Sequence, residues 1–306
     1  MKWQGVLPAM TTCFDEELKV DHAFMTRHAS WMLDSGCTGI VSLGSLGEAA
    51  TLNFDEKIAI LKNMVATANG RAPIVAAISA LSTVEAVSLA KAAADCGCEG
   101  LMVLPPYVYL GDWREMKAHV AAIFEATPLS CMLYNNPVAY GTDFLPEQIH
   151  ELASEHPNMQ AVKESSTDVR RIAAIRAIED GRLQILVGVD DLIVEGIAAG
   201  ATGWIAGLVN ALPVESVALF DLATQGRARE CTGEAFELYR WFLPLLRMDT
   251  VPKFIQLIKL VQQEVGEGSA RVRPPRLELT GSELNAACAV IRAAIENRPS
   301  LMAKVE

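Results

Sequence analysis

Residues 73–106, which read PIVAAISALSTVEAVSLAKAAADCGCEGLMVLPP, contain one complete unit of the pattern that decides the fold. Apolar runs begin at 73–75 and at 100–103, and a longer segment of helical period lies between them, near 83–96. Gly97 falls where the C-terminus of such a helix is expected. The stretch therefore predicts a strand, a helix and a second strand in succession.

The same alternation extends in both directions from this stretch and gives eight apolar runs in all. The runs begin near Gly5, Thr38, Pro73, Gly100, Leu129, Met159, Gln184 and Thr202. Segments of helical period follow them near 21–35, 54–69, 83–96, 112–126, 145–153, 168–179, 191–199 and 213–225. Near-continuous apolar strands are typical of a parallel sheet that is covered on both faces. Eight such units in about 225 residues predict an α/β fold, the (β/α)8 TIM barrel.

We expect residues 1–225 to form the barrel and residues 226–306 to form a C-terminal helical extension. From about Gly226 onward the strand pattern stops, and helices are expected near 231–245, 250–265 and 281–295. The alternative for the eight units is a doubly wound sheet. No GxGxxG motif follows the first strand, so the sequence does not indicate the dinucleotide site that is common in such sheets.

The composition limits the kinds of partner that the protein can have. The chain has 306 residues, 51% of them hydrophobic, and a net charge of −11 without a cluster of basic residues. Nucleic acid is therefore not an expected partner, because phosphate binding needs a basic surface. No apolar run approaches the ~20 residues of a membrane span, and the N-terminus does not resemble a signal peptide. We expect a cytoplasmic protein with free thiols at its 7 scattered cysteines.

Lys163 lies where a barrel carries its chemistry, at the C-terminal end of the sixth strand. Burial of a lone ammonium is very costly, so a lysine there must lose its charge or find a partner. The structural alternative is an ion pair, but the neighbouring Glu164 should point to the other face of the strand. The position favours an amine nucleophile with a lowered pKa, which is what Schiff-base chemistry requires.

Three other strand ends carry candidate groups. Tyr134 could pack its ring in the core, or its phenol could shuttle protons beside the amine. The turn Gly44-Ser45-Leu46-Gly47-Glu48 has glycines on both sides of a hydroxyl, and its backbone amides favour a carboxylate ligand. Asp190 and Asp191 could bind a metal, but adjacent aspartates without a nearby histidine more often cap a helix. We therefore expect no metal site.

Together these motifs resemble the N-acetylneuraminate lyase and dihydrodipicolinate synthase family of class I, Schiff-base-forming barrels. The resemblance covers essentially the whole chain and keeps the family's order and spacing. It depends on the GxxGE turn (Gly44 to Glu48), the YN-x-P turn (Tyr134 to Pro137), the VKESS strand (Val162 to Ser166), the G-x-D-D segment (Gly188 to Asp191) and the closing segment Gly203 to Asn210.

The resemblance implies a role for each motif. Lys163 would form the Schiff base, Tyr134 would transfer protons, and Ser45 with the amide of Leu46 would receive the substrate carboxylate. Substrate contacts are implied at Leu46, Gly47, Tyr107, Asn136, Ala139, Tyr140, Gly188 and Ile205. A lysine iminium is itself an electron sink, so no metal or organic cofactor is expected. The resemblance also implies a homotetramer, built as a dimer of dimers, that acts on a small 2-oxo acid or its cyclic imine.

Three departures from the family's pattern bear on the substrate. Dihydrodipicolinate synthases carry an arginine for a second carboxylate where this chain has Ala139, and a methyl cannot replace a bidentate guanidinium. Leu46 replaces a threonine of the usual turn. The usual relay tyrosine aligns with Val108, so that Tyr107 or Tyr109 would have to substitute for it.

Within the family, the chain most resembles the Δ1-pyrroline-4-hydroxy-2-carboxylate deaminases, which form 2,5-dioxopentanoate (α-ketoglutarate semialdehyde) and ammonia in hydroxyproline degradation. The alternative enzymes are an aldolase or dehydratase of 2-keto-3-deoxy sugar acids and an N-acetylneuraminate-lyase-type aldolase. Dihydrodipicolinate synthase is disfavoured by Ala139. A non-catalytic sensor of 2-oxo acids is an alternative from another class, although such a sensor does not need an amine nucleophile.

Overall fold

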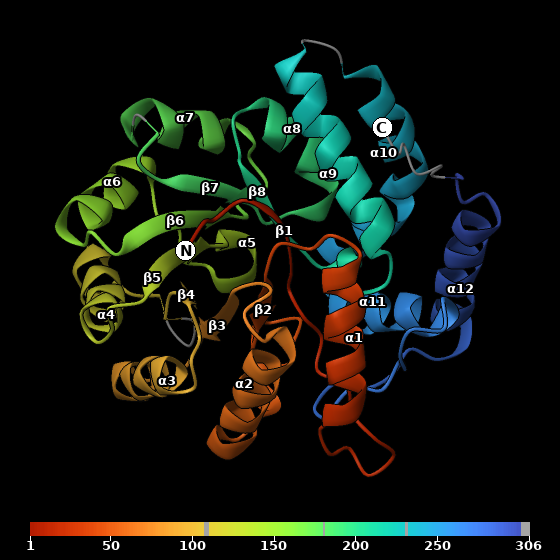
Figure 1. Cartoon of the computed structure of the whole chain (residues 1–306), viewed down its shortest axis with the longest axis horizontal. Helices are drawn as coiled ribbons and strands as arrows, with labels where there is room; N and C mark the ends of the chain where they lie inside the picture. Colours follow the sequence, from red (N-terminus) through yellow and green to blue (C-terminus); the bar gives the residue numbers. More distant parts are fainter. Residues whose placement is uncertain (107–109, 180, 230–231, 301–306) are drawn as a thin grey trace.

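The computed structural model describes residues 1–306 except 107–109, 180, 230–231 and 301–306. Eight parallel strands form one sheet in the order β1-β8-β7-β6-β5-β4-β3-β2. A parallel bridge between Ala9 and Val41 joins the two ends of this order. The sheet therefore closes into the predicted (β/α)8 barrel, and the doubly wound alternative is wrong (Figure 1).

All eight predicted strands are present, and they are short and buried. They are β1 Gly5–Pro8, β2 Ile40–Ser42, β3 Ile74–Ile78, β4 Gly100–Val103, β5 Ser130–Asn135, β6 Met159–Glu164, β7 Gln184–Val187 and β8 Gly203–Ala206. Every residue of β2, β3, β4 and β8 is buried. One face of each strand packs inside the barrel and the other against a helix, which explains the near-continuous apolar runs.

The predicted helices alternate with the strands and surround the barrel (Figure 1). They are α1 His22–Asp34, α2 Phe54–Ala68, α3 Thr83–Asp95, α4 Trp113–Glu125, α6 Pro146–Glu155, α7 Arg170–Glu179, α8 Ile193–Ala198 and α9 Pro213–Ala228. Local sequence sets where they begin: the side chain of Ser82 accepts from Glu85 N ahead of α3, and Asn53 and Glu56 form a capping box at α2. A short helix that the sequence did not predict, α5 Pro137–Tyr140, follows β5.

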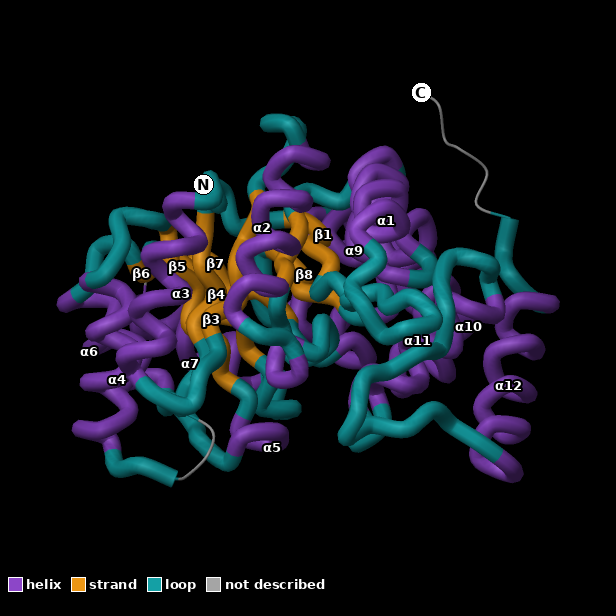
Figure 2. The backbone as a smooth tube through the Cα atoms, turned by 90° about the horizontal axis from the view of Figure 1, so that it is seen from below, coloured by secondary structure: helices purple, strands orange, loops and turns teal. Residues whose placement is uncertain are grey.

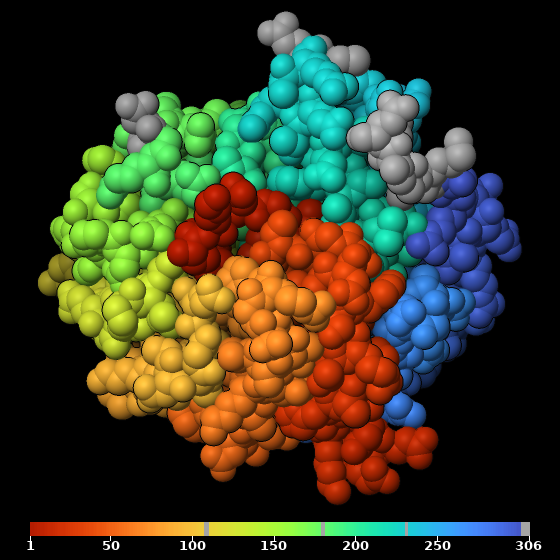
Figure 3. Space-filling model, viewed as in Figure 1, coloured from red at the N-terminus to blue at the C-terminus, as the bar shows by residue number. Residues whose placement is uncertain are grey.

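The N-terminal segment closes the barrel end at which the strands begin (Figure 3). Trp3 is buried, and its Nε1 donates to Ser130 Oγ at the first residue of β5. A Cβ at Gly100, where β4 starts, would lie 2.7 Å from Met1 Sδ and 3.0 Å from the Trp3 ring. The opposite end, where the strands finish, therefore remains for a ligand.

The C-terminal residues form the expected helical extension, beside α1 and α9 (Figure 2). Its elements are α10 Gly233–Leu246, the 3-10 turn η4 Arg247–Thr250, α11 Phe254–Glu264 and α12 Gly281–Glu296. The expected boundary at residue 226 falls inside α9, and Gly226 is buried there. The boundary expected between residues 225 and 226 therefore falls within a helix of the barrel.

Six cysteines lie in the described residues, and all six are free thiols, as expected. They are Cys13, Cys37, Cys96, Cys98, Cys131 and Cys288. The seventh, Cys231, lies outside the described residues. Over the described part of the chain, no helix has the length and apolar character needed to cross a membrane.

Candidate active site

A cavity of about 550 Å³ opens at the end of the barrel where the strands finish. Nine of the predicted site residues line it: Ser45, Leu46, Tyr134, Asn136, Ala139, Tyr140, Lys163, Gly188 and Ile205. Gly47 does not line it, and Tyr107 lies outside the described residues, as do Val108 and Tyr109. Residues from five different strand ends therefore meet at one place, as the barrel rule predicts.

Lys163 projects from β6 into this cavity and is 6% exposed. Its Nζ lies 4.0 Å from the centre of the Tyr134 ring, on the neighbouring strand. A Cβ at Gly188 would lie 2.6 Å from Lys163 Cε, so glycine at 188 makes room for the lysine. Burial lowers the pKa of Lys163 to about 8, and the carboxyls of Asp249 and Asp190 limit the shift. A substantial fraction of the amine is therefore neutral near physiological pH.

Glu164, the next residue along β6, points away from the cavity as predicted. Its carboxylate accepts from Asn135 Nδ2 at 3.1 Å and from the backbone N of Ser166 at 2.6 Å. The structural alternative, an ion pair between Lys163 and Glu164, is therefore wrong.

Tyr134 holds its hydroxyl in the same cavity at the end of β5. The hydroxyl accepts a hydrogen bond of 2.9 Å from Asn136 Nδ2, and burial raises the pKa of Tyr134 to about 12. The Tyr140 ring meets it edge-on, with centroids 5.9 Å apart and an interplanar angle of 85°. The phenol is thus fixed beside the amine and stays protonated at neutral pH.

The turn after β2 presents Ser45 to the cavity, where its Oγ hydrogen-bonds with the hydroxyl of Tyr140. Tyr140, which the short helix α5 carries, thus links this turn to the Tyr134 side of the cavity. Gly47 is turned inward instead. Its carbonyl accepts from Thr12 Oγ1 at 2.7 Å, and a Cβ there would lie 2.9 Å from Met10 O. Glycine at 47 therefore serves the close packing of the turn.

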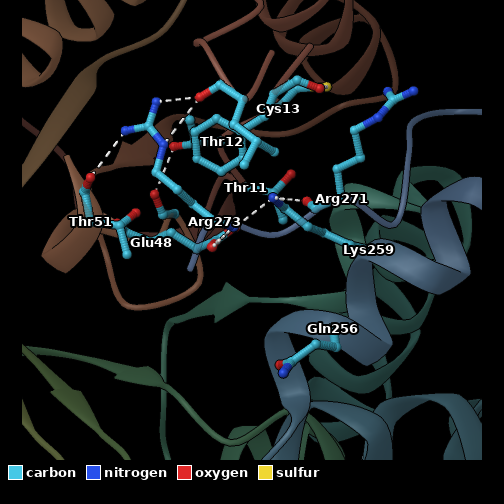
Figure 4. Close-up of polar contacts among 12 residues, drawn as sticks. Thr11, Thr12, Cys13, Glu48, Thr51, Gln256, Lys259, Arg271 and Arg273 are labelled. Atoms are coloured by element: carbon cyan, nitrogen blue, oxygen red, sulfur yellow. Dashed lines mark hydrogen bonds and ion pairs between the residues drawn. The ribbon is translucent and has the colours of Figure 1, made fainter. Parts of the chain in front are cut away.

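Glu48 ties this turn to the C-terminal extension (Figure 4). The residue has a positive φ of 54° and is fully buried. Its carboxylate accepts a hydrogen bond of 2.5 Å from Nζ of Lys259, on α11, and one of 3.0 Å from the backbone N of Arg273. Lys259 Nζ also donates to Arg271 O at 2.7 Å. The role of Glu48 could not be predicted from the sequence, because its partners are more than 200 residues away in the chain.

Asp190 is a buried hydrogen-bond acceptor. Its carboxylate accepts from Trp204 Nε1 at 2.9 Å and from the backbone N atoms of Gly207 and Leu208, at 3.1 and 2.8 Å. It therefore caps the 3-10 turn η3 Leu208–Asn210 after β8. Asp190 does cap a helical turn, as predicted. The turn that it caps, however, begins 17 to 18 residues later in the chain and is not the one that Asp190 itself starts. Within the described residues, no group of acidic, histidine or cysteine side chains could hold a metal ion.

The extension contributes cavity residues that the sequence analysis missed. Asp249, Thr250, Val251, Pro252, Phe254 and Arg276 line one side of the cavity. They follow no barrel strand, so the strand-end rule could not nominate them. Asp249 and Arg276 are the ionisable members of this set.

A buried lysine beside a phenol at the mouth of a (β/α)8 barrel is the arrangement of an enzyme that works through a lysine Schiff base. Residues 2–294 match the model of the Dihydrodipicolinate synthetase family, and the chain belongs to that family. The family is one of class I, Schiff-base lyases, so this protein is an enzyme of that kind.

Individual relatives agree with this assignment. The chain is 35% identical to a 4-hydroxy-tetrahydrodipicolinate synthase of Natronomonas pharaonis, over 77% of this chain and 81% of the relative. It is 30% identical to the enzyme of that name from Anaplasma marginale, over 92% of each. A putative dihydrodipicolinate synthetase from Pseudomonas aeruginosa superposes with a TM-score of 0.89 at 28% identity, covering 96% of this chain and 100% of that one. The dihydrodipicolinate synthase from Acinetobacter baumannii, complexed with pyruvate, gives 0.88 at 28% identity, covering 95% and 98%.

Proposed function

We propose that the protein is a Δ1-pyrroline-4-hydroxy-2-carboxylate deaminase, which releases 2,5-dioxopentanoate and ammonia. The observation that carries the proposal is the cavity wall after β5. Ala139 lines the wall where dihydrodipicolinate synthases place an arginine, and its neighbour Val138 is also aliphatic. A second carboxylate, or several sugar hydroxyls, would find no polar side chain at these two positions. A substrate with one carboxylate and one hydroxyl needs none there.

The single carboxylate has a place at the turn that holds Ser45, which also lines the cavity. Arg276 also lines the cavity. Burial lowers the pKa of Lys259, and the charge of Arg276 lowers it further. A cation that lines the same cavity favours the carboxylate that Ser45 and the amide of Leu46 would bind.

The reaction begins at Lys163. The neutral amine adds to C2 of the cyclic imine, and the C2 bond to the ring nitrogen breaks, which frees the amine on C5. The resulting iminium acidifies C3, and the freed amine takes the C3 proton, either directly or through the Tyr134 hydroxyl, which gives up its own proton as it accepts the new one. The C4 hydroxyl leaves as water, and tautomerisation gives an imine at C5. Water hydrolyses that imine to an aldehyde and ammonia, and a second water frees Lys163. One water is lost and two are consumed, so the net reaction adds one water.

A second candidate is 4-hydroxy-tetrahydrodipicolinate synthase, which the names of the relatives favour. That activity and the proposed one require the same lysine but different residues in the cavity wall. The choice between them depends on Ala139. The sugar-acid enzymes are also candidates, because they require the same lysine and differ in the wall residues. Membership in a family of enzymes disfavours the non-catalytic sensor of 2-oxo acids.

The test is a direct assay of three substrates in parallel. Purified protein receives enzymatically generated Δ1-pyrroline-4-hydroxy-2-carboxylate, pyruvate with aspartate semialdehyde, or a 2-keto-3-deoxy sugar acid. Semialdehyde formation is followed through a coupled dehydrogenase. Turnover of the first substrate, at least tenfold above the other two, is expected. Turnover of either of the other two alone would replace the proposed substrate.

Two further properties belong to the same proposal. By family resemblance we expect a homotetramer, a dimer of dimers, in the cytoplasm. Multi-angle light scattering of the purified protein measures the mass directly, and four times the 33.1 kDa chain is the expected value.

A further inference from the structure

Asp249 brings a carboxyl group to the cavity from outside the barrel. It lies on η4, which packs against η2 Asp190–Leu192, the turn that follows β7. Its side chain approaches Gly207 at the end of β8 so closely that a Cβ at 207 would overlap the carboxyl oxygen. Asp249 lines the cavity together with Lys163 and Tyr134. The C-terminal extension thus places an acidic group next to the predicted nucleophile.

The Asp249 carboxyl differs from its neighbour Asp190 in its partners. Asp190 is fully buried and accepts three backbone and indole hydrogen bonds. Asp249 is half-buried, and among the described residues no donor hydrogen-bonds to its carboxyl oxygens. Asp190 therefore has a structural task that occupies its lone pairs, whereas Asp249 is free to interact with a ligand.

The surroundings of Asp249 favour its neutral form. Burial raises the pKa of Asp249 well above its ordinary value, the charge of Asp190 raises it further, and Lys163 opposes the shift. Asp191, also on η2, acts in the same direction as Asp190. Tyr134 is the other proton donor nearby, but its pKa of about 12 makes it a much weaker acid. A neutral carboxyl is the better donor to a departing hydroxyl near neutral pH.

We propose that Asp249 is the acid that protonates the C4 hydroxyl of the substrate as it leaves. This inference rests on the proposed deaminase function and names the group that the dehydration step needs. The base takes the C3 proton, and the C3–H electron pair stays on carbon, where it forms the lysine enamine and then the C3=C4 double bond. The C4–O bond breaks with its electron pair on oxygen, and that oxygen takes the Asp249 proton and departs as water. Asp249 is left as a carboxylate, and the proton that the base took from C3 returns to it, so the dehydration step neither gains nor loses a proton overall.

The experiment separates the dehydration step from the steps that precede it. Pyruvate forms the lysine Schiff base and exchanges its methyl protons for deuterium, but it has no hydroxyl to lose. In Asp249→Asn, semialdehyde formation from the pyrroline substrate should fall by roughly 10²–10⁴-fold. Borohydride trapping with pyruvate and the methyl exchange rate, followed by NMR, should stay within about threefold of the wild type. Asp221→Asn, an exposed substitution of the same kind on α9, serves as the matched control.

A better leaving group provides the second measurement. A 4-chloro analogue of the substrate loses chloride, which needs no proton, so Asp249→Asn and Asp249→Ala should process it at nearly the wild-type rate. Equal losses of turnover and of pyruvate exchange would overturn the proposal, because the carboxyl would then act on Lys163 or on folding. Turnover of the hydroxy substrate within threefold of the wild type would also overturn it. Absence of semialdehyde formation in the wild type would instead overturn the proposed function, and this inference with it.

Discussion

The cavity has two walls that originate differently. The barrel wall consists of strand ends and carries Lys163, Tyr134 and Ser45, whereas the extension wall carries Asp249 and Arg276. The barrel wall holds the proposed nucleophile, Lys163, and the phenol proposed to transfer protons, Tyr134. The extension wall holds groups that a particular substrate could need. We therefore expect the barrel to set the reaction class, and side chains from both walls to set which reaction of that class is catalysed.

The largest effect is expected at the barrel wall, from Lys163→Ala. Without an amine there is no Schiff base, so semialdehyde formation should fall to the background rate and borohydride should trap no pyruvate. Mass spectrometry of the trapped protein checks the second point. Substantial turnover in this variant would show that the barrel wall does not supply the nucleophile. The exposed Lys253→Ala, with a surface ion pair to Glu283, is the control.

Tyr134→Phe tests the proton-transfer role of the same wall. The ring packing against Lys163 and Tyr140 is kept and the hydroxyl is lost, so turnover should fall by roughly 10²–10⁴-fold while the fold is unchanged. Steady-state kinetics and circular dichroism measure the two effects. A rate within threefold of the wild type would assign proton transfer to another group, such as the freed substrate amine.

The barrel wall could be predicted from sequence because its residues obey a local rule. Eight apolar runs predicted the strands, and each strand end nominated the residues that follow it, which is why Lys163 and Tyr134 were found. The same rule nominated the turn at 44–48 correctly but not the direction of each residue. Gly47 faces inward because Glu48, with a left-handed backbone, turns toward α11.

The extension wall could not be predicted, because its place depends on tertiary packing. Nothing in the sequence near Asp249 distinguishes a cavity carboxyl from a surface one, since it follows a helix and not a strand. It reaches the cavity because α10 packs against α8 and α9, and η4 then contacts η2. The buried pair Glu48–Lys259 was missed for the same reason. A charged residue in an otherwise apolar helix face, such as Lys259 among Ile255, Ile258 and Leu260, was the available signal.

The Glu48–Lys259 ion pair connects the turn after β2 to α11 of the extension, and breaking it should destabilise the protein. In Lys259→Met the Glu48 carboxylate stays buried without its partner, so we expect a loss of about 3–5 kcal/mol in the free energy of unfolding. Urea denaturation followed by circular dichroism measures it. The matched control is Lys253→Met, whose pair with Glu283 is half-exposed and should be worth less than about 1 kcal/mol. Equal losses in the free energy of unfolding of the two variants would mean that the Glu48–Lys259 pair stabilises the protein no more than a surface ion pair does.

The smallest predicted effect is the pH dependence of Schiff-base formation, to which both walls contribute. Attack requires the neutral amine, and burial in the barrel lowers the pKa of Lys163 to about 8, against the carboxyls of Asp249 and Asp190. The initial rate of borohydride-trapped pyruvate adduct should therefore rise about tenfold per pH unit below 8 and level off above it. Tyr134, also in contact with the lysine, keeps its proton over this range because its pKa is about 12. A rate that continues to rise to pH 10 would mean that Lys163 titrates as an exposed lysine does, and that neither wall shifts it.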